Sequence, residues 1–268
     1  MKKKIVILTS IGKRHIALCK YLNEVKGIYV KKCFFEKKNL LDEHVKSCKN
    51  NKYIFRHLQD RKKNEKLIFK KILSSRKKLS FSYVYKNYFS TKYFINEIKK
   101  IKPDLIIVYG TSIIKGDLLN LYKNKIINMH LGLSPYYRGS GTNYFSLVNN
   151  RPELFGTTFL FLDKGIDTGK IIHQLRADFK AEYNSHDIGN NLILKSFNHL
   201  SKLIINFKKI KLKHLKTRRK NFLFRRKMFG NSSLRLMNKN FKEKFIELYL
   251  NNKTKRDKNY PIISQKWV

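Results

Sequence analysis

The chain has 268 residues, which allows one large domain or one domain with an appendage. Hydrophobic residues make up 42% of it, so the composition argues against a disordered chain. No apolar run approaches the roughly 20 residues of a membrane span, and the run in residues 1–10 is too short for a secretory signal. The three cysteines are odd in number and unpatterned, which predicts a reduced, cytoplasmic protein.

The net charge of +42, from 60 Lys and Arg against 18 Asp and Glu, favours anionic partners such as nucleic acid, phosphate groups or a membrane surface. A composition bias from AT-rich coding DNA is the alternative. Residues 31–80 carry 17 basic and 5 acidic side chains, and residues 201–268 carry 21 and 3. Residues 101–180 carry only 10 and 6. The positive charge therefore lies mainly in the flanks of the central stretch.

Apolar runs and apolar stripes predict alternating strands and helices. The expected strands cover residues 4–8, 29–35, 103–110, 126–129, 155–162 and 170–175, and the expected helices cover residues 14–25, 115–122 and 186–207, with Ser185 as a candidate N-cap. Residues 37–100 are mostly helical in pattern. This alternation predicts an α/β, Rossmann-like three-layer fold with a mostly parallel sheet over residues 1–210. Residues 211–268 are predicted to form a basic, partly helical C-terminal extension.

The turn after the first expected strand is not a Gly-x-Gly-x-x-Gly or a Walker loop, so nothing in it indicates a dinucleotide or a nucleotide triphosphate. Ser10, Lys13 and Arg14, followed by His15, lie at the expected start of a helix. Free backbone N–H groups at a helix N-terminus favour anions. These residues are therefore a candidate phosphate site, and a solvated turn is the alternative.

Three polar residues follow expected strands of the sheet. Asn128 and His130 lie at the end of one strand, and Asp167 lies in a glycine-bounded turn. A carboxylate that hydrogen-bonds to a histidine fixes its tautomer, and an amide can donate to an oxygen that gains negative charge. Ser134 lacks an elbow motif, and no cysteine lies nearby. The set therefore suits attack by a substrate nucleophile on a bound carbonyl, with proton transfer by His130 and Asp167.

Metal chemistry is the rival interpretation of this region. His130, Asp167 and His173 could meet in the fold, but the sequence has none of the usual His and Cys spacings of a zinc site. A packing role on a strand is the simpler interpretation of His173. No metal is expected.

The sequence resembles the folate-dependent formyltransferases in residues 127–130, 133–139 and 165–169. It also resembles that family in residues 102–110, which correspond to the strand that leads into the folate pocket. The resemblance implies a Rossmann-like fold and 10-formyltetrahydrofolate as formyl donor. It also implies Asn128, His130 and Asp167 as the catalytic triad. The backbone around the two flanking segments would hold the pterin end; its residues are Val108, Tyr109, Gly110, Thr111, Gly165 and Ile166.

The chain departs from the family where His-Pro-Ser-Leu-Leu-Pro is common, because residues 130–135 read His-Leu-Gly-Leu-Ser-Pro. The run at residues 139–143 also differs from the usual tRNA enzyme. These differences leave the triad intact but put the acceptor in doubt. They resemble formyltransferases of surface-polysaccharide pathways. The candidate acceptor contacts are Ser10, Lys13, Arg14, Tyr137, Arg138 and Asn143.

The sequence therefore predicts transfer of a formyl group to a primary amine, with a small anionic acceptor, an amino-sugar nucleotide, as the leading expectation. One alternative is a methionyl-tRNA formyltransferase, in which Phe222, Phe224 and Phe229, interleaved with basic residues, would stack on bases. The extension is short for the separate β-barrel of those enzymes. A formyltetrahydrofolate hydrolase, in which water replaces the amine, is the other alternative.

Overall fold

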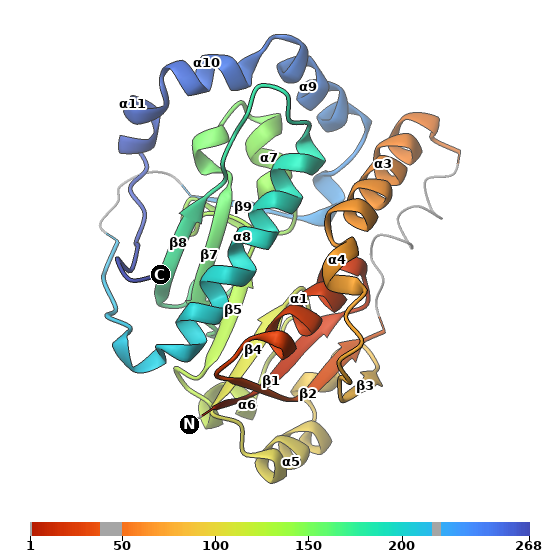
Figure 1. The fold of residues 1–268 in the computed structure, drawn as a ribbon. Helices are drawn as coiled ribbons and strands as arrows, with labels where there is room; N and C mark the ends of the chain where they lie inside the picture. The colour runs from red at the N-terminus through yellow and green to blue at the C-terminus, as the bar shows by residue number, and fades with distance from the viewer. Residues whose placement is uncertain (1, 38–49, 216–220) are drawn as a thin grey trace.

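The computed structural model describes residues 2–37, 50–215 and 221–268. Its centre is a seven-stranded sheet in the order β3-β2-β1-β4-β5-β7-β8, with helices on both faces (Figure 1). The strands are β1 (Lys3–Ser10), β2 (Ile28–Glu36), β3 (Phe81–Val84), β4 (Leu105–Tyr109), β5 (Ile126–His130), β7 (Gly156–Phe161) and β8 (Ile171–Arg176). All neighbours from β3 to β5 are parallel, and β7 is antiparallel to both β5 and β8. The predicted Rossmann-like, mostly parallel α/β fold is confirmed.

The helices cover both faces of the sheet and its upper end in Figure 1. They are α1 (Lys13–Glu24), α3 (Lys52–Ile68), α4 (Lys70–Leu73), α5 (Lys92–Ile101), α6 (Asp117–Leu121), α7 (Thr142–Val148), α8 (Ser185–Ile205), α9 (Asn231–Lys242), α10 (Phe245–Asn251) and α11 (Lys253–Lys258). The described ranges also contain the 3₁₀ turns η1 (Tyr88–Ser90), η2 (Pro152–Leu154), η3 (Phe207–Lys209) and η4 (Arg226–Met228). A second sheet of two short strands pairs β6 (Tyr137–Gly139) with β9 (Phe222–Phe224).

The central strands are buried on both faces, which is why they stand out in the sequence as continuous apolar runs. In β1, Ile5 and Ile7 face the larger core with α1 and α8, whereas Val6 and Leu8 face the smaller core with α5 and α6. This alternation follows from the two-residue repeat of a strand. The three layers of the predicted fold are these two helical layers and the sheet between them.

One expectation for an individual element is incomplete and another is wrong. The described part of residues 37–100 is mostly helical, as expected, but it also contains the edge strand β3, whose Phe81 and Tyr83 are about half exposed; residues 38–49 of that stretch lie outside the described ranges. The N-cap of α8 is Asn184 and not Ser185. The Asn184 side chain accepts hydrogen bonds from two backbone amides of the first turn, and the Asp187 carboxylate accepts one from the Asn184 amide. That reciprocal pair is a capping box, which stabilises the helix start.

The C-terminal extension packs onto the large core and forms no separate core within the described residues. Phe224, Leu234, Met237 and Tyr249 join the same buried cluster as the central strands. Helices α9, α10 and α11 cross the top of the molecule in Figure 1. The chain then returns along the edge strand β8, where the amide of Gln174 donates to the carbonyl of Ile263 at 2.7 Å.

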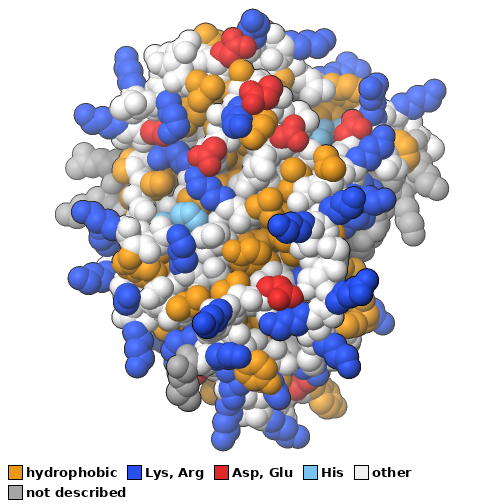
Figure 2. Space-filling model, viewed as in Figure 1, with side chains coloured by type: hydrophobic (Ala, Val, Ile, Leu, Met, Phe, Trp, Pro, Cys, Tyr) orange, Lys and Arg blue, Asp and Glu red, His pale blue; other side chains and the backbone are white. Residues whose placement is uncertain are grey.

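The surface carries the charge that the composition predicts. Figure 2 shows Lys and Arg side chains spread around the whole outline of this face, with a few acidic side chains among them. None of the helices in the described ranges is both long and apolar enough to span a membrane.

Candidate active site

The three predicted catalytic side chains converge at the carboxyl end of the parallel strands. Asn128 lies in β5 between β4 and β7, opposite Val108 and Leu160. Its amide nitrogen Nδ2 donates to Asp167 Oδ1 at 3.2 Å. His130 ends the same strand, and its Nδ1 lies 3.3 Å from Asp167 Oδ2. Asp167 therefore contacts both Asn128 and His130, as predicted, although it follows them by 39 and 37 positions in the sequence.

The backbone of β6 completes the surroundings of the triad. The amide of Gly139 donates to Asp167 Oδ2 at 2.9 Å, and His130 Nε2 lies 3.1 Å from the carbonyl of Tyr137. The imidazole is 6% exposed and lies between two oxygen acceptors, so each ring nitrogen has an oxygen to which it can donate. Asp167 adopts a left-handed backbone with a φ of 53°, which aims its carboxylate at both partners.

Gly132 supports His130 in a way that the sequence pattern did not reveal. A Cβ atom on Gly132 would lie 2.6 Å from His130 Nε2, and it would also clash with the Thr142 side chain. Thr142 in turn donates its hydroxyl to the carbonyl of Leu131. In this chain, therefore, the close approach of His130 and Thr142 leaves room only for a glycine at residue 132. The glycine itself, in a motif that commonly has a serine, was the available signal.

The residues expected to hold the donor flank the triad on two sides. Val108 and Tyr109 are buried at the end of β4, next to Asn128 in β5, and Gly110 follows with a φ of 70°. On the other side, Gly165 and the 39% exposed Ile166 are the two residues before Asp167. The hydroxyl of Thr111 donates to the carbonyl of Ser112. The role of all six residues in donor binding stays a prediction.

Glu36 holds the loop that carries these donor-side residues. It is fully buried at the end of β2, where Oε2 accepts from the amide of Ser112 and Oε1 accepts from the amide of Asn87, both at 2.8 Å. A carboxylate that accepts from backbone amides fixes two loops at once. Glu36 was not predicted from the sequence, where its signal is an acidic residue directly after an apolar run in a basic stretch.

The candidate phosphate residues have different surroundings. Lys13 is exposed at the start of α1, which has no side-chain cap. Ser10 is buried, and His15 packs against Tyr109 with ring centroids 4.5 Å apart. Burial and the neighbouring Arg14 lower the pKa of His15 to about 3, so this histidine is neutral at pH 7.

Arg14 is held inside the protein by Glu65, a buried residue of α3. Its Nε donates to Glu65 Oε1 at 3.0 Å, and Arg61 donates to the same oxygen at 2.9 Å. Burial alone would raise the pKa of Glu65, but the two guanidinium groups lower it to about 2. Arg14 therefore shares one carboxylate with Arg61 within the chain, and its contact with the acceptor stays a prediction.

The other three candidate acceptor contacts also have partners within the protein. The hydroxyl of Tyr137 accepts from Asn149 Nδ2 at 2.9 Å, and Asn143 Oδ1 accepts from the amide of Gly156 at 3.0 Å. Arg138 donates to the carbonyl of Ile166 at 3.3 Å and to the side chain of Asn221, a residue of the C-terminal extension. Their roles toward an acceptor stay predictions.

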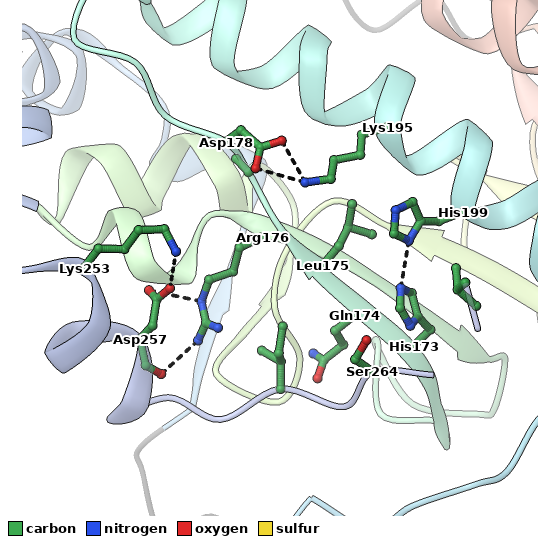
Figure 3. Close-up of a pocket in the computed structure, with 13 residues that line it drawn as sticks. His173, Gln174, Leu175, Arg176, Asp178, Lys195, His199, Lys253, Asp257 and Ser264 are labelled. Carbon is green, nitrogen blue, oxygen red and sulfur yellow. Dashed lines mark hydrogen bonds and ion pairs between the residues drawn. The ribbon is translucent and has the colours of Figure 1, made fainter. Parts of the chain in front are cut away.

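His173 does not join the triad. It lines a separate hollow of about 290 Å³ at the edge of β8, shown in Figure 3, and its Nε2 lies 2.9 Å from His199 Nδ1. Its Nδ1 accepts from the amide of Gln265 at 3.0 Å. Among the described residues, no group of three or more His, Cys, Asp or Glu side chains is placed to hold a metal ion. The rival set of His130, Asp167 and His173 is therefore not assembled.

Comparison with known proteins agrees with this geometry. The model of the formyl transferase family matches residues 42–204, which is more than half of the chain and includes the whole triad. A methionyl-tRNA formyltransferase of Finegoldia magna is 30% identical over 114 residues, or 42% of this chain and 36% of that protein. One of Desulforamulus reducens is 41% identical over 81 residues, or 30% and 25%. The matches thus span about a third of these relatives or less.

Solved structures share the fold at low sequence identity. A phosphoribosylglycinamide formyltransferase of Anaplasma phagocytophilum superimposes with a TM-score of 0.56 at 15% identity, covering 84% of this chain and 99% of that one. One of Brucella melitensis gives 0.55 at 14% identity, covering 78% and 97%. The likeness to these structures concerns the fold alone. Taken with the match over residues 42–204, it is consistent with one conclusion: the chain belongs to the formyl transferase family.

Proposed function

We propose that the chain transfers a formyl group from 10-formyltetrahydrofolate, consumed as a substrate, to a primary amine. The observation that carries this proposal is the convergence of Asn128, His130 and Asp167 without a nucleophile of the protein. Among the described residues, no Ser, Thr or Cys side chain hydrogen-bonds to His130 or Asp167. A site of this kind suits a reaction in which the acceptor supplies the attacking atom.

Each member of the triad has a role that follows from its contacts. Asn128 is oriented by Asp167 and can donate its second N–H to the formyl oxygen as that oxygen gains negative charge. His130 is held by Asp167 and moves a proton between the attacking amine and the leaving nitrogen of the donor. Preorganised donors of this type typically contribute a factor of about 100 to 1,000 in rate.

The surroundings fit the donor in their chemistry. Among the described residues, the buried hydroxyl of Ser112, just after the end of β4, has no hydrogen-bond partner, and the hydroxyl of Tyr109 at the end of β4 lies beside Arg14. Such unpartnered polar groups are costly unless a ligand or water satisfies them. Ile166 offers an exposed apolar side chain on the other side. A ligand with a flat polar ring and an apolar edge would satisfy both sides.

An amino-sugar nucleotide is the acceptor that we propose. Its diphosphate suits the uncapped start of α1 and the exposed Lys13, which lie at the carboxyl end of β1 beside β4. The buried position of Phe224, at 6% exposure, also removes one of the three aromatic residues that would stack on tRNA bases. Methionyl-tRNA is the second candidate, because the relatives with similar sequences are methionyl-tRNA formyltransferases. A hydrolase would use the same triad with water.

One acceptor panel separates these functions. The purified chain is incubated with 10-formyltetrahydrofolate and with 4-amino-sugar nucleotides, methionyl-tRNA or no acceptor, and formylated product and free formate are measured. Formylated sugar nucleotide supports the proposal. Formylated methionyl-tRNA, with a steep decrease at higher salt, identifies the second candidate. Free formate without an acceptor identifies the hydrolase, and absence of any formyl release refutes formyl chemistry at this site.

A further inference from the structure

Strand β6 is the element that contacts two members of the triad with its backbone. The Tyr137 carbonyl lies 3.1 Å from His130 Nε2, and the Gly139 amide donates to Asp167 at 2.9 Å. A three-residue strand outside the main sheet has little stability of its own. The geometry of the triad therefore depends on what holds β6 in place.

The partner of β6 is β9, which belongs to the basic C-terminal extension. The amide of Phe222 donates to the Tyr136 carbonyl at 2.7 Å, and the amide of Ser140 donates to the Phe224 carbonyl at 2.9 Å. The two backbones approach closely at Gly139, where a Cβ atom would lie 2.2 Å from the Phe224 carbonyl oxygen. Gly139 thus allows the extension to pair directly beside the contact with Asp167.

Ring contacts of Phe224 and a hydrogen bond from Arg138 anchor β9. The ring of Phe224 stacks on Phe145 of α7, with centroids 4.6 Å apart and planes within 7°, and it also meets Tyr137 at 4.7 Å. Arg138 forms a bridge on the solvent side, because it donates to the Ile166 carbonyl at 3.3 Å and to Asn221 Oδ1 at 3.1 Å. The Arg138 bridge therefore ties the turn that carries Asp167 to the residue that precedes β9.

We propose that the extension positions the catalytic triad: Phe224 and Asn221 are positioning residues that hold β6 against His130 and Asp167. The inference rests on the proposed function for its effect on catalysis. It differs from a role of the extension in acceptor binding alone. A binding role predicts a raised KM for the acceptor at unchanged kcat, whereas a positioning role predicts a lowered kcat at unchanged KM.

Four variants of the full chain test the proposal. Asn221→Ala removes the acceptor of Arg138 at an exposed site, and Asn221→Asp retains an oxygen there. Phe224→Ala removes the stacked ring, and Leu236→Ala is the control, an exposed residue of α9 in the same extension. Each is assayed for formyl transfer, with kcat and both KM values. The ring signals of His130 are followed by NMR and assigned with His130→Gln.

We expect Asn221→Ala to lower kcat about tenfold, the worth of one hydrogen bond to a charged group, with both KM values within about twofold. Asn221→Asp should restore kcat, and Phe224→Ala should lower it about 100-fold, as a displacement of about 1 Å would. The His130 signals should move in Asn221→Ala and Phe224→Ala but not in Leu236→Ala.

Unchanged kcat in Asn221→Ala, or an effect confined to KM, overturns the proposal even if Phe224→Ala fails to fold. The NMR signals separate this failure from a failure of the proposed function. If wild type transfers no formyl group, signals of His130 that move on mutation of Asn221 still support positioning by β9. Signals that stay unmoved overturn it.

Discussion

Glu65 provides the sharpest stability prediction, because one buried carboxylate compensates two arginines. It is 2% exposed, and it accepts hydrogen bonds from Arg14 and Arg61. Replacing Glu65 by Gln keeps the shape of the side chain and removes its charge. Within the part of the chain that the structure describes, Arg14 and Arg61 then lose the carboxylate that both contact, which is unfavourable, above all for the more buried Arg14.

The magnitude follows from the pKa of Glu65. Its ordinary value of 4.5 falls to about 2 in the folded protein. Since one pKa unit corresponds to about 1.4 kcal/mol, this lowering of the Glu65 pKa corresponds to about 3 kcal/mol of folding stability. Because the folded pKa is lowered, this stability is present above about pH 4.5 and is lost as the pH falls toward about 2. We therefore expect Glu65→Gln to lower the free energy of unfolding at pH 7 by about 3 kcal/mol.

Urea unfolding followed by circular dichroism, at several pH values between 7 and 3, measures both effects. Wild type should lose stability below about pH 4.5 more steeply than Glu65→Gln, because the variant lacks the titrating group. Asp178→Asn is the matched control: Asp178 pairs with Lys195 on the surface at 76% side-chain exposure, and such pairs contribute about 1 kcal/mol or less. A Glu65→Gln variant within about 0.5 kcal/mol of wild type at pH 7, or with the same pH slope, would refute the reasoning.

Three further predictions concern the site and the C-terminal edge. Asp167→Asn should lower kcat about a hundredfold or more without unfolding the chain, because Asn tolerates a φ of 53°; near-wild-type turnover argues against the triad. Gly132→Ala should lower kcat about 100-fold by displacing the catalytic imidazole, whereas Gly230→Ala, which has open space around it, should not. Burial, together with His199, lowers the pKa of His173 to about 4, so acid weakens the folded state between about pH 6.5 and 4. Hydrogen exchange at the Gln265 amide, corrected for its intrinsic pH dependence, should accelerate about tenfold at pH 4; unchanged protection contradicts this.

The sequence predicts most of the central sheet because its strands are buried on both faces and therefore appear as apolar runs. The run that forms β4 is the clearest example, since all five of its residues are buried. The edge strand β3 was missed because only Val84 of its four residues is buried, and the surrounding stretch is helical and rich in lysine. Strand β9 has three residues and pairs with a strand about 85 positions earlier, a contact that no local pattern indicates.

The meeting of Asn128, His130 and Asp167 could be predicted because residue types and motif spacing point to it, whereas the residues that support them could not. The contact of Glu36 with Ser112 joins residues 76 positions apart, and that of Arg14 with Glu65 joins residues 51 positions apart. Phe224 was interpreted as one of a series of aromatic residues among basic ones. The aromatic and basic residue types predicted a surface that stacks on bases. The structure instead places Phe224 in the core, because the extension folds back and stacks Phe224 on Phe145.

The scarcity of acidic residues has a structural consequence for the surface. Glu36, Glu65 and Glu153 are each at most 2% exposed, and each fixes parts of the chain that are distant in sequence. Glu153, for example, lies 2.7 Å from Arg256 in α11, which ties the extension to η2. At least three of the 18 acidic side chains thus act inside the protein, so fewer remain to offset surface lysines. The net charge of +42 makes the field outside the molecule positive, which would favour the approach of the anionic acceptor that we propose.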